Sequence, residues 1–304
     1  MQENKILLSH GSGGKLTHEL IEKLFKGKFN NEILNLLDDS AVFQIDSGQR
    51  LAFTTDSFVV KPIFFPGGDI GKLAVCGTIN DLAVCGAKPL FISCSAIIEE
   101  GFSIDKLEKI VESIRQTAKM AGVKIVTGDT KVVEKGSCDE IFINTSGIGI
   151  VPDGINLSIE KIKPGDKILI NGPIAEHGIS IIKSRERLDF KAEIKSDCAP
   201  LNELCISISS KVKFMRDPTR GGVSAVLNEI VSGRNFGIKI YEERIPVRKN
   251  VKTFCDILGF DPLYVGNEGK VIVIVEEKNV QQVLKTMKKN KYGKNSCVIG
   301  EVVH

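Results

Sequence analysis

Residues 53–89 read FTTDSFVVKPIFFPGGDIGKLAVCGTINDLAVCGAKP, and they contain the end of a predicted strand followed by a predicted helix. The strand covers residues 51–55, and the helix covers residues 69–84, where Gly86 and Pro89 end it. A hydrophobic strand followed by a helix of this length indicates a fold that mixes both kinds of element.

Strands and helices also alternate on both sides of this stretch. The pattern predicts strands at residues 41–45, 90–98, 123–126 and 140–150, and a helix at 103–121. After the break Val151-Pro152-Asp153-Gly154, it predicts helices at 176–187, 201–209, 222–232, 248–258 and 279–288, and strands at 167–170, 237–241, 270–275 and 297–303. The interleaving predicts an α/β or α+β protein with two domains, residues 1–152 and 153–304.

The composition indicates a soluble globular protein. Its 304 residues, of which 42% are hydrophobic, are enough for a large core and about two domains. Lysine and arginine exceed aspartate and glutamate by only 41 − 38 = 3 and are spread along the chain, so we expect no nucleic-acid partner. The chain shows no signal peptide and no apolar stretch of about 20 residues, so we expect no membrane partner and a cytoplasmic location.

The eight cysteines show no Cys-x-x-Cys spacing and no paired cluster, which argues against a disulfide framework. The four histidines likewise lack the spacing of a zinc site. The cysteines are therefore expected to be reduced and mostly buried, with redox sensitivity as the alternative.

Four short acidic motifs punctuate the first half of the chain. They are Asp38-Asp39-Ser40-Ala41, Thr54-Thr55-Asp56-Ser57, Asn80-Asp81-Leu82-Ala83 and Thr127-Gly128-Asp129-Thr130. Asp56 and Asp129 are each expected to follow a strand, so a parallel arrangement would bring their carboxylates together. Magnesium binds hard oxygen ligands and keeps several waters, so a few carboxylates with phosphate oxygens would hold it. The four motifs together predict a magnesium-ATP site, although capping alone would explain each single aspartate.

A glycine-rich loop, Gly11-Ser12-Gly13-Gly14-Lys15, precedes these acids and is expected to bring a lysine to the phosphates. It is not a Walker A loop, because Ser9 occupies the first glycine position and Leu16 follows the lysine. A helix is expected at residues 15–25. Taken alone, a glycine-rich terminus is more simply explained as flexible chain.

Three further positions carry possible chemistry. Asp81 lies late in its predicted helix, where the helix dipole disfavours a negative charge, so either a bound cation or a structural salt bridge should compensate it. Residues 216–222, RDPTRGG, open a helix and offer glycines and arginines to an anion, with an ordinary capped turn as the alternative. In Gly266-Asn267-Glu268-Gly269 a carboxylate stands between glycines, where a general base could act.

These motifs, in this order, resemble the family that contains aminoimidazole ribonucleotide synthetase, selenide water dikinase, thiamine monophosphate kinase and the hydrogenase maturation factor HypE, and the HypE branch matches best. The resemblance runs from Ser9 to about Val303. It is carried by HGSGGKLTHELI, LLDDSAVF, residues 53–89, TGDTKVV, AEHGISIIKSRE, MRDPTRGGV and GNEG. It implies a two-domain α/β (α+β) fold of the aminoimidazole ribonucleotide synthetase type, with N-terminal strands forming a dimer barrel and a C-terminal α/β sandwich.

The resemblance also implies roles for individual residues, with ATP and Mg²⁺ as cofactors. The implied metal ligands are Asp39, Asp56, Asp81 and Asp129. The implied nucleotide-binding residues are Gly11, Gly13, Gly14, Lys15, Asp38, Asn80, Thr130, Asp217 and Arg220. The implied catalytic residues are Lys131, Glu268 and His177.

The implied reaction is the ATP-dependent dehydration of a carbamoylated C-terminal cysteine to a thiocyanate, which provides the cyanide ligands of NiFe hydrogenase. The implied partners are a second copy of the chain, the HypF carbamoyltransferase and a complex of HypC with HypD. HypE chains end in a Pro-Arg-x-Cys tail, whereas this chain stops at Glu301-Val302-Val303-His304, so it is expected to bind ATP without modifying itself. The alternatives are a small-molecule kinase or synthetase of the same superfamily and a non-catalytic, nucleotide-sensing scaffold for HypF or HypC-HypD.

Overall fold

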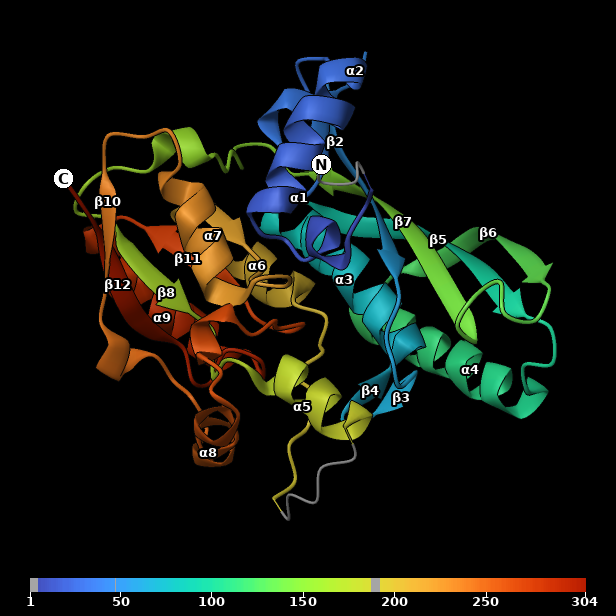
Figure 1. The fold of residues 1–304 in the computed structure, drawn as a ribbon. Helices are drawn as coiled ribbons and strands as arrows, with labels where there is room; N and C mark the ends of the chain where they lie inside the picture. The colour runs from blue at the N-terminus through green and yellow to red at the C-terminus, as the bar shows by residue number, and fades with distance from the viewer. Residues whose placement is uncertain (1–4, 47, 187–191) are drawn as a thin grey trace.

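The structure is a computed structural model that describes residues 5–46, 48–186 and 192–304. Each half of the chain builds one five-stranded sheet, and helix α3 (Ile70–Val84) lies between the two sheets (Figure 1). Within the described ranges, every helix is too short or too polar to cross a lipid bilayer.

The first sheet has the strand order β1-β2-β7-β5-β6 and is antiparallel except for the pair β5 and β6. Its strands are β1 (Ala41–Gln44), β2 (Arg50–Phe58), β5 (Lys88–Glu99), β6 (Lys124–Val133) and β7 (Ile141–Val151). Helices α3 and α4 (Ile104–Ala121) cover one face of this sheet around buried side chains such as Ile79, Ile110 and Ile143. The opposite face, here called the open face, carries exposed side chains of β2, β5 and β6.

Helix α3 begins and ends as the sequence predicted. The short hairpin of β3 (Phe64–Phe65) and β4 (Gly68–Asp69) leads into it, and the Asp69 carboxylate accepts hydrogen bonds from Gly71 N at 2.8 Å and Lys72 N at 3.0 Å. These bonds satisfy amides that have no partner inside the helix. After the last turn, Gly86 adopts a φ of 80°, a conformation that favours glycine and ends the helix.

The second sheet has the order β10-β12-β8-β11-β9 and is antiparallel throughout. Its strands are β8 (Lys167–Ile170), β9 (Phe214–Arg216), β10 (Gly237–Ile240), β11 (Ile272–Val275) and β12 (Cys297–Val303). One face packs on α5 (Glu176–Arg185), α7 (Gly222–Val231) and α8 (Lys249–Leu258), and the other packs on α6 (Asn202–Ile208) and α9 (Val280–Lys289). This is the α/β sandwich that the resemblance implies. Ala83 and Val84, at the end of α3, join the second core and connect the two halves.

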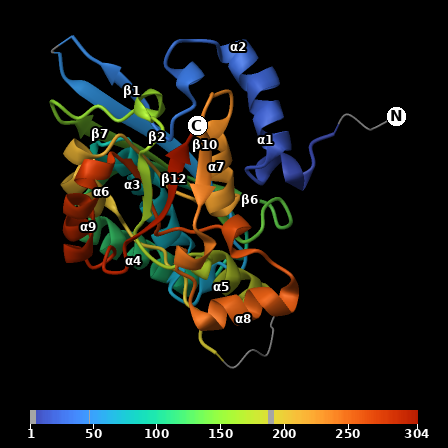
Figure 2. The same ribbon diagram turned by 90° about the vertical axis from the view of Figure 1, so that its left-hand side faces the viewer.

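The N-terminal segment lies beside α7 of the second half (Figure 2). It contains α1 (Lys15–Leu20), a π-helical stretch (Ile21–Lys26) and α2 (Gly27–Phe29), so the predicted helix at 15–25 is present but changes its hydrogen-bonding pattern. Short 3₁₀ turns occupy Leu8–Gly11, Leu34–Leu36, Ile159–Lys161, Ser209–Lys211, Glu242–Arg244, Pro262–Tyr264 and Glu277–Asn279.

Several predicted boundaries differ from the structure. Asp56 and Asp129 do not follow their strands but lie inside β2 and β6, which continue past the acidic motifs. The polar side chains are tolerated because one face of the sheet is open. Strand β9 was not predicted, and Arg187, the last residue of the predicted helix at 176–187, lies outside the described residues. All eight cysteines are free, as predicted.

Candidate magnesium-nucleotide site

Four aspartates from different elements meet between the two sheets. Asp39 precedes β1, Asp56 lies in β2, Asp81 lies near the end of α3, and Asp217 follows β9. The hydroxyl oxygen of Thr54 lies 2.9 Å from Asp81 Oδ2 and 3.0 Å from the backbone oxygen of Asp39. Both halves of the chain therefore contribute to one group of carboxyls, which we call the aspartate cluster.

Crowding and burial disfavour the charged forms of these carboxyls. Burial raises the pKa of Asp81 well above its usual range, and the nearby charges of Asp217, Asp39 and Asp56 raise it further. Burial likewise raises the pKa of Asp217 to about 8 and that of Asp39 to about 6. In the described part of the chain, the ion pairs of the cluster go to Asp39 and Asp56, and the salt bridge that was the alternative to a cation at Asp81 does not form. The aspartate cluster therefore holds more acid than its counter-ions neutralise.

Arg216 is the main counter-ion of the aspartate cluster. Its guanidinium lies 3.2 Å from the Asp39 carboxylate and 3.3 Å from Glu229 of α7, and it donates to the backbone oxygen of Leu37 at 3.5 Å. Glu229 also lies 3.3 Å from the imidazole of His18 in α1. Because carboxylates already engage Arg216, the structure places it to hold neighbouring segments together rather than to meet an anion.

Asp56 points toward α3. A Cβ added to Gly77 would lie 3.7 Å from Asp56 Oδ2, and the Arg220 guanidinium lies 4.0 Å from Asp56 Oδ1. Burial raises the pKa of Asp56, and the charge of Arg220 partly opposes this rise. The Arg220 side chain is 67% exposed, so it remains accessible to a ligand.

The glycine-rich loop rests against the turn that carries Arg220. Gly13 has a φ of 79°, and a Cβ there would lie 2.9 Å from the Cβ of Arg220, so only glycine fits at this position. Gly11 ends the first 3₁₀ turn, and Gly14 immediately precedes α1. The Lys15 side chain is 88% exposed, which leaves its ammonium group accessible.

Asp129 lies apart from the aspartate cluster within one chain. In the sheet register, Asp56 aligns with Thr145 of β7 and Gly128 of β6, so Asp129 belongs to the next row. Alternate rows of a sheet face opposite sides, which puts Asp129 and Lys131 on the open face. The prediction that Asp56 and Asp129 converge is therefore wrong for a single chain. Of the remaining predicted residues, Thr130 and Asp38 are exposed.

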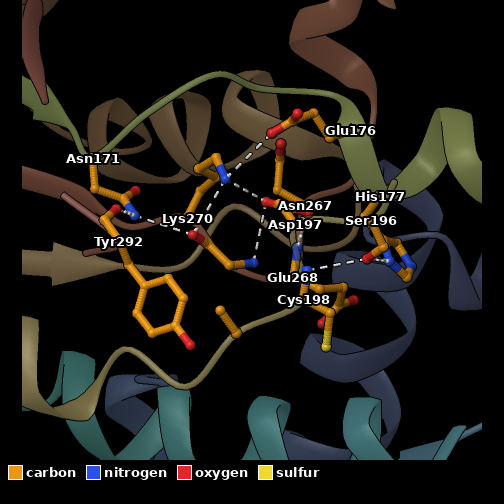
Figure 3. A network of polar contacts seen from close by, with 12 residues as sticks. Asn171, Glu176, His177, Ser196, Asp197, Cys198, Asn267, Glu268, Lys270 and Tyr292 are labelled. Atoms are coloured by element: carbon orange, nitrogen blue, oxygen red, sulfur yellow. Dashed lines mark hydrogen bonds and ion pairs between the residues drawn. The ribbon is translucent and has the colours of Figure 1, made fainter. Parts of the chain in front are cut away.

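A second group of polar side chains surrounds Glu268 (Figure 3). Both oxygens of the Asp197 carboxylate accept hydrogen bonds, one from Glu268 N and one from Gly269 N, each at 3.2 Å. The Lys270 ammonium lies 2.8 Å from the same carboxylate. Burial opposes ionisation of Asp197, but the charge and hydrogen bond of Lys270, together with the backbone donor of Glu268, outweigh it and lower the pKa of this carboxyl.

Glu268 itself keeps an unengaged carboxyl, which makes no hydrogen bond or ion pair with the described residues. Burial raises its pKa well above the usual range, and the nearby charges of Cys198, Asp217, Asp197 and Asp56 raise it further. Because two of these charges belong to the aspartate cluster, Glu268 lies within electrostatic reach of that cluster.

His177 is buried beside this second group. Its Nδ1 lies 2.8 Å from Ser196 Oγ, and its ring meets Phe65 edge-on with 5.5 Å between centroids. Ser196 Oγ also accepts a hydrogen bond from Cys198 N at 3.1 Å, which ties His177 to the segment that follows Asp197. Burial lowers the pKa of His177 and so favours the neutral imidazole.

Asn80 bridges the two halves of the chain. Its side-chain nitrogen donates to Ala199 O at 3.1 Å and Glu268 O at 3.4 Å, and its side-chain oxygen accepts from Leu201 N at 2.8 Å. The amide is 1% exposed, so protein atoms use its hydrogen-bonding capacity. The structure thus places Asn80 behind the site, where it orders the Glu268 segment.

The oxygen-rich donor set suits a hard divalent cation. Ser40 Oγ, next to Asp39, is the buried side-chain oxygen without a hydrogen-bond partner in the described ranges. No three His, Cys, Asp or Glu side chains of the described residues already stand in an arrangement that could hold a metal ion. Magnesium would therefore need phosphate oxygens and water to complete its coordination, as it commonly does in nucleotide sites.

Known proteins match both halves of this chain. The family described as AIR synthase related protein, N-terminal domain, matches residues 37–151, and its C-terminal domain matches residues 163–304. The carbamoyl dehydratase HypE of Bradyrhizobium diazoefficiens is 48% identical over 300 residues, which cover 97% of this chain and 86% of the relative. The chain belongs to the HypE family. In a crystal structure of a HypE-HypF complex, the matching chain is 53% identical with a TM-score of 0.89 over 93% of each chain.

In a crystal structure of HypE in complex with ATP, the HypE sequence is 44% identical to that of this HypE family member. The TM-score is 0.81, and the match covers 98% of this chain and 89% of that chain. These matches confirm the family and the two-domain fold that the sequence motifs predicted.

Sequence reasoning missed the residues that hold the site together. Thr54 was quoted only as part of an acidic motif, and Arg216 was interpreted as a donor for anions. Asp197 and Lys270 carry no recognisable spacing, since 73 residues separate them. The position of Lys270, directly after the GNEG motif, was the one available indication.

Proposed function

We propose that this HypE family member is an ATP-dependent carbamoyl dehydratase that converts an S-carbamoyl cysteine into a thiocyanate during hydrogenase maturation. Family membership supports the process, because related chains carry the name carbamoyl dehydratase HypE. The observation that carries the proposal is the under-neutralised aspartate cluster beside the unengaged carboxyl of Glu268.

We propose ATP and Mg²⁺ as the cofactors, supported by a related HypE that is known in complex with ATP. Asp39, Asp56 and Asp81 would hold the metal within one chain, directly or through water. Arg220 and the exposed Lys15 would contact the phosphates. Bound magnesium would supply the positive charge that the cluster lacks and so lower the pKa values of its carboxyls. Asp38, Thr130 and Asp217 are proposed to border the nucleotide.

The proposed reaction removes one water from the carbamoyl group. The carbamoyl oxygen attacks the γ-phosphorus of ATP and ADP leaves. The C–O bond then breaks and phosphate departs with one N–H proton, and loss of the other N–H proton to a base leaves a C≡N bond. Glu268 is proposed to accept one of these protons and Lys131 to stabilise charge on the transferred oxygens. His177 would contact the substrate through Nε2, because its Nδ1 already faces Ser196. Because Glu268 must be ionised to act, the rate should rise with pH through its raised pKa.

We also propose that two copies pack through the open face of the first sheet. Phe53 and Ile97, which lie on this face, are 45% and 43% exposed, so a partner would bury apolar surface there. Packing of the open faces would also bring Asp129 and Lys131 to the interface between copies. A solution mass of 33.2 kDa, that of one chain, would contradict the dimer.

Further partners follow from the proposed reaction. We propose HypF as the source of the carbamoyl group, supported by a related HypE that is known in complex with HypF. A complex of HypC with HypD is proposed to receive the cyanide, and the cytoplasm is the proposed location. We place the domain boundary between residues 152 and 153.

The decisive experiment supplies the substrate group directly. The chain, Mg-ATP and a synthetic peptide that ends in S-carbamoyl cysteine are incubated together, and the peptide mass and phosphate release are followed. We expect the peptide to lose one water for each ATP that is hydrolysed to ADP. An unchanged peptide with no phosphate release contradicts the dehydratase and favours a nucleotide-sensing scaffold.

A further inference from the structure

The segment from Gly266 to Lys270 has no regular secondary structure, yet other segments fix its backbone on two sides. On one side lies Asp197, whose carboxylate receives the N–H groups of Glu268 and Gly269 at 3.2 Å each. One carboxylate thus holds two successive peptide groups of the segment that carries the proposed base.

The opposite side of the same peptide is held by one donor from each half of the chain. The carbonyl oxygen of Glu268 accepts from Ala199 N at 3.3 Å and from the Asn80 amide at 3.4 Å. At Gly269, an added Cβ would collide with the backbone oxygen of Asp197, so the two segments are in direct contact. The backbone of Glu268 therefore has little freedom to shift.

The polar side chains of Asn267 and Lys270 in this segment have hydrogen-bond or ion-pair partners, whereas the carboxyl of Glu268 has none among the described residues. Asn267 is 1% exposed, donates to Pro218 O at 3.0 Å and accepts from Ala175 N at 2.8 Å. Lys270 is 7% exposed and pairs with Asp197. Of these neighbours in the described chain, only Glu268 has a carboxyl free for chemistry.

We propose that Asp197 is a positioning residue that aims the Glu268 carboxyl at the substrate by clamping the backbone amides of residues 268 and 269, with Lys270 keeping the clamp ionised. This inference rests on the proposed dehydratase function and deepens it. Asp197 touches no reacting atom, so its effect passes through the orientation of Glu268.

The charge of Asp197 gives this role a distinctive signature. Four titratable groups near Glu268 raise its pKa when they are ionised, namely Cys198, Asp217, Asp197 and Asp56. Asp197 is the member whose ionisation the protein itself secures, because Lys270 lowers its pKa. Removing this charge should lower the pKa of Glu268, whereas a purely structural defect would leave that pKa in place.

The test compares Asp197→Asn with a matched control, Asp166→Asn. The Asp166 carboxylate also pairs with a lysine at 2.8 Å, the partly buried Lys213, and it lies in the same half of the chain, directly before β8. For Asp197→Asn we expect kcat for the S-carbamoyl peptide to fall about 10- to 100-fold with little change in the KM for ATP. The rising limb of its pH-rate profile should move to lower pH by about half a unit. Asp166→Asn should lose stability without either change.

A second readout does not depend on activity. Hydrogen exchange of the amides in residues 266–270 should accelerate in Asp197→Asn and stay at the wild-type rate in Asp166→Asn. The positioning role would be overturned if Asp197→Asn kept the wild-type kcat, the wild-type pH position of the rising limb and the wild-type rate of hydrogen exchange. A wild-type chain that never dehydrates the peptide would instead refute the proposed function, while exchange still decides whether Asp197 orders the segment.

Discussion

Two groups of acids lie where the two halves of the chain meet, and they differ in how their charge is neutralised. In the aspartate cluster, Asp81 and Asp217 have raised pKa values and no ion pair with the described residues. In the second group, Asp197 has Lys270 at 2.8 Å, two backbone donors and a lowered pKa. Burial alone therefore does not decide ionisation. Partnered acids maintain the fold, and acids without partners are available to a charged ligand.

The largest effect should come from breaking the paired group. In Lys270→Met, the Asp197 carboxylate, whose side chain is 2% exposed, would lose its counter-ion while remaining buried. We expect a loss of about 3 to 5 kcal/mol of unfolding free energy, because an unpaired buried charge is costly. Urea denaturation at neutral pH measures this loss.

The matched control for that variant is Lys61→Met. Lys61 pairs with Asp139 at 2.9 Å, but the two side chains are 63% and 50% exposed. An exposed pair contributes about 0 to 1 kcal/mol, so the control should change stability little. Equal losses of unfolding free energy in the two variants would mean that the buried ion pair stabilises the fold no more than a surface ion pair does.

A smaller and different effect should follow from changing the under-neutralised group. Burial raises the pKa of Asp81 and so opposes its charged form, and Asp81→Asn replaces the carboxyl with an uncharged amide of the same size. Stability should stay within about 0.5 kcal/mol of wild type. Affinity for Mg-ATP should fall at least about tenfold, or 1.4 kcal/mol, because one oxygen ligand is lost.

Titration calorimetry measures the affinity of Asp81→Asn for Mg-ATP. The control is Asp139→Asn, at an exposed position between β6 and β7. If Asp81→Asn binds Mg-ATP as tightly as the control does, Asp81 is not part of the metal site. A large loss of stability in Asp81→Asn would instead place Asp81 with the structural acids such as Asp197.

The sequence predicted the parts of this molecule that depend on local pattern. Helix α3 was predicted from its apolar run and its stop at Gly86 and Pro89, and the motif order led to the family. The acids of the aspartate cluster were named from their motifs. Each of these inferences uses residues close together in the chain, where spacing carries the information.

The sequence could not predict what depends on tertiary register. A shift of one position along β6 decides that Asp129 faces away from Asp56, and no local pattern encodes that alignment. Likewise, the pairing of Asp197 with Lys270 appears only when segments 73 residues apart are brought together. The interpretation of Arg216 as an anion donor failed for the same reason, since its carboxylate partners come from elsewhere in the chain.

The central claim is that the aspartate cluster lacks positive charge, and the melting temperature measured from pH 5 to pH 9, with and without Mg²⁺, tests it most directly. Folding raises the pKa of Asp39 to about 6 and that of Asp217 to about 8, so the folded chain binds more protons than the unfolded chain, in which these carboxyls have the ordinary aspartate pKa of 3.8. Stability without metal should therefore fall as pH rises through 6 and 8. Mg²⁺ should raise the melting temperature more at pH 9 than at pH 5. A melting temperature that stays constant over this range, or a Mg²⁺ effect that does not grow with pH, would contradict the account.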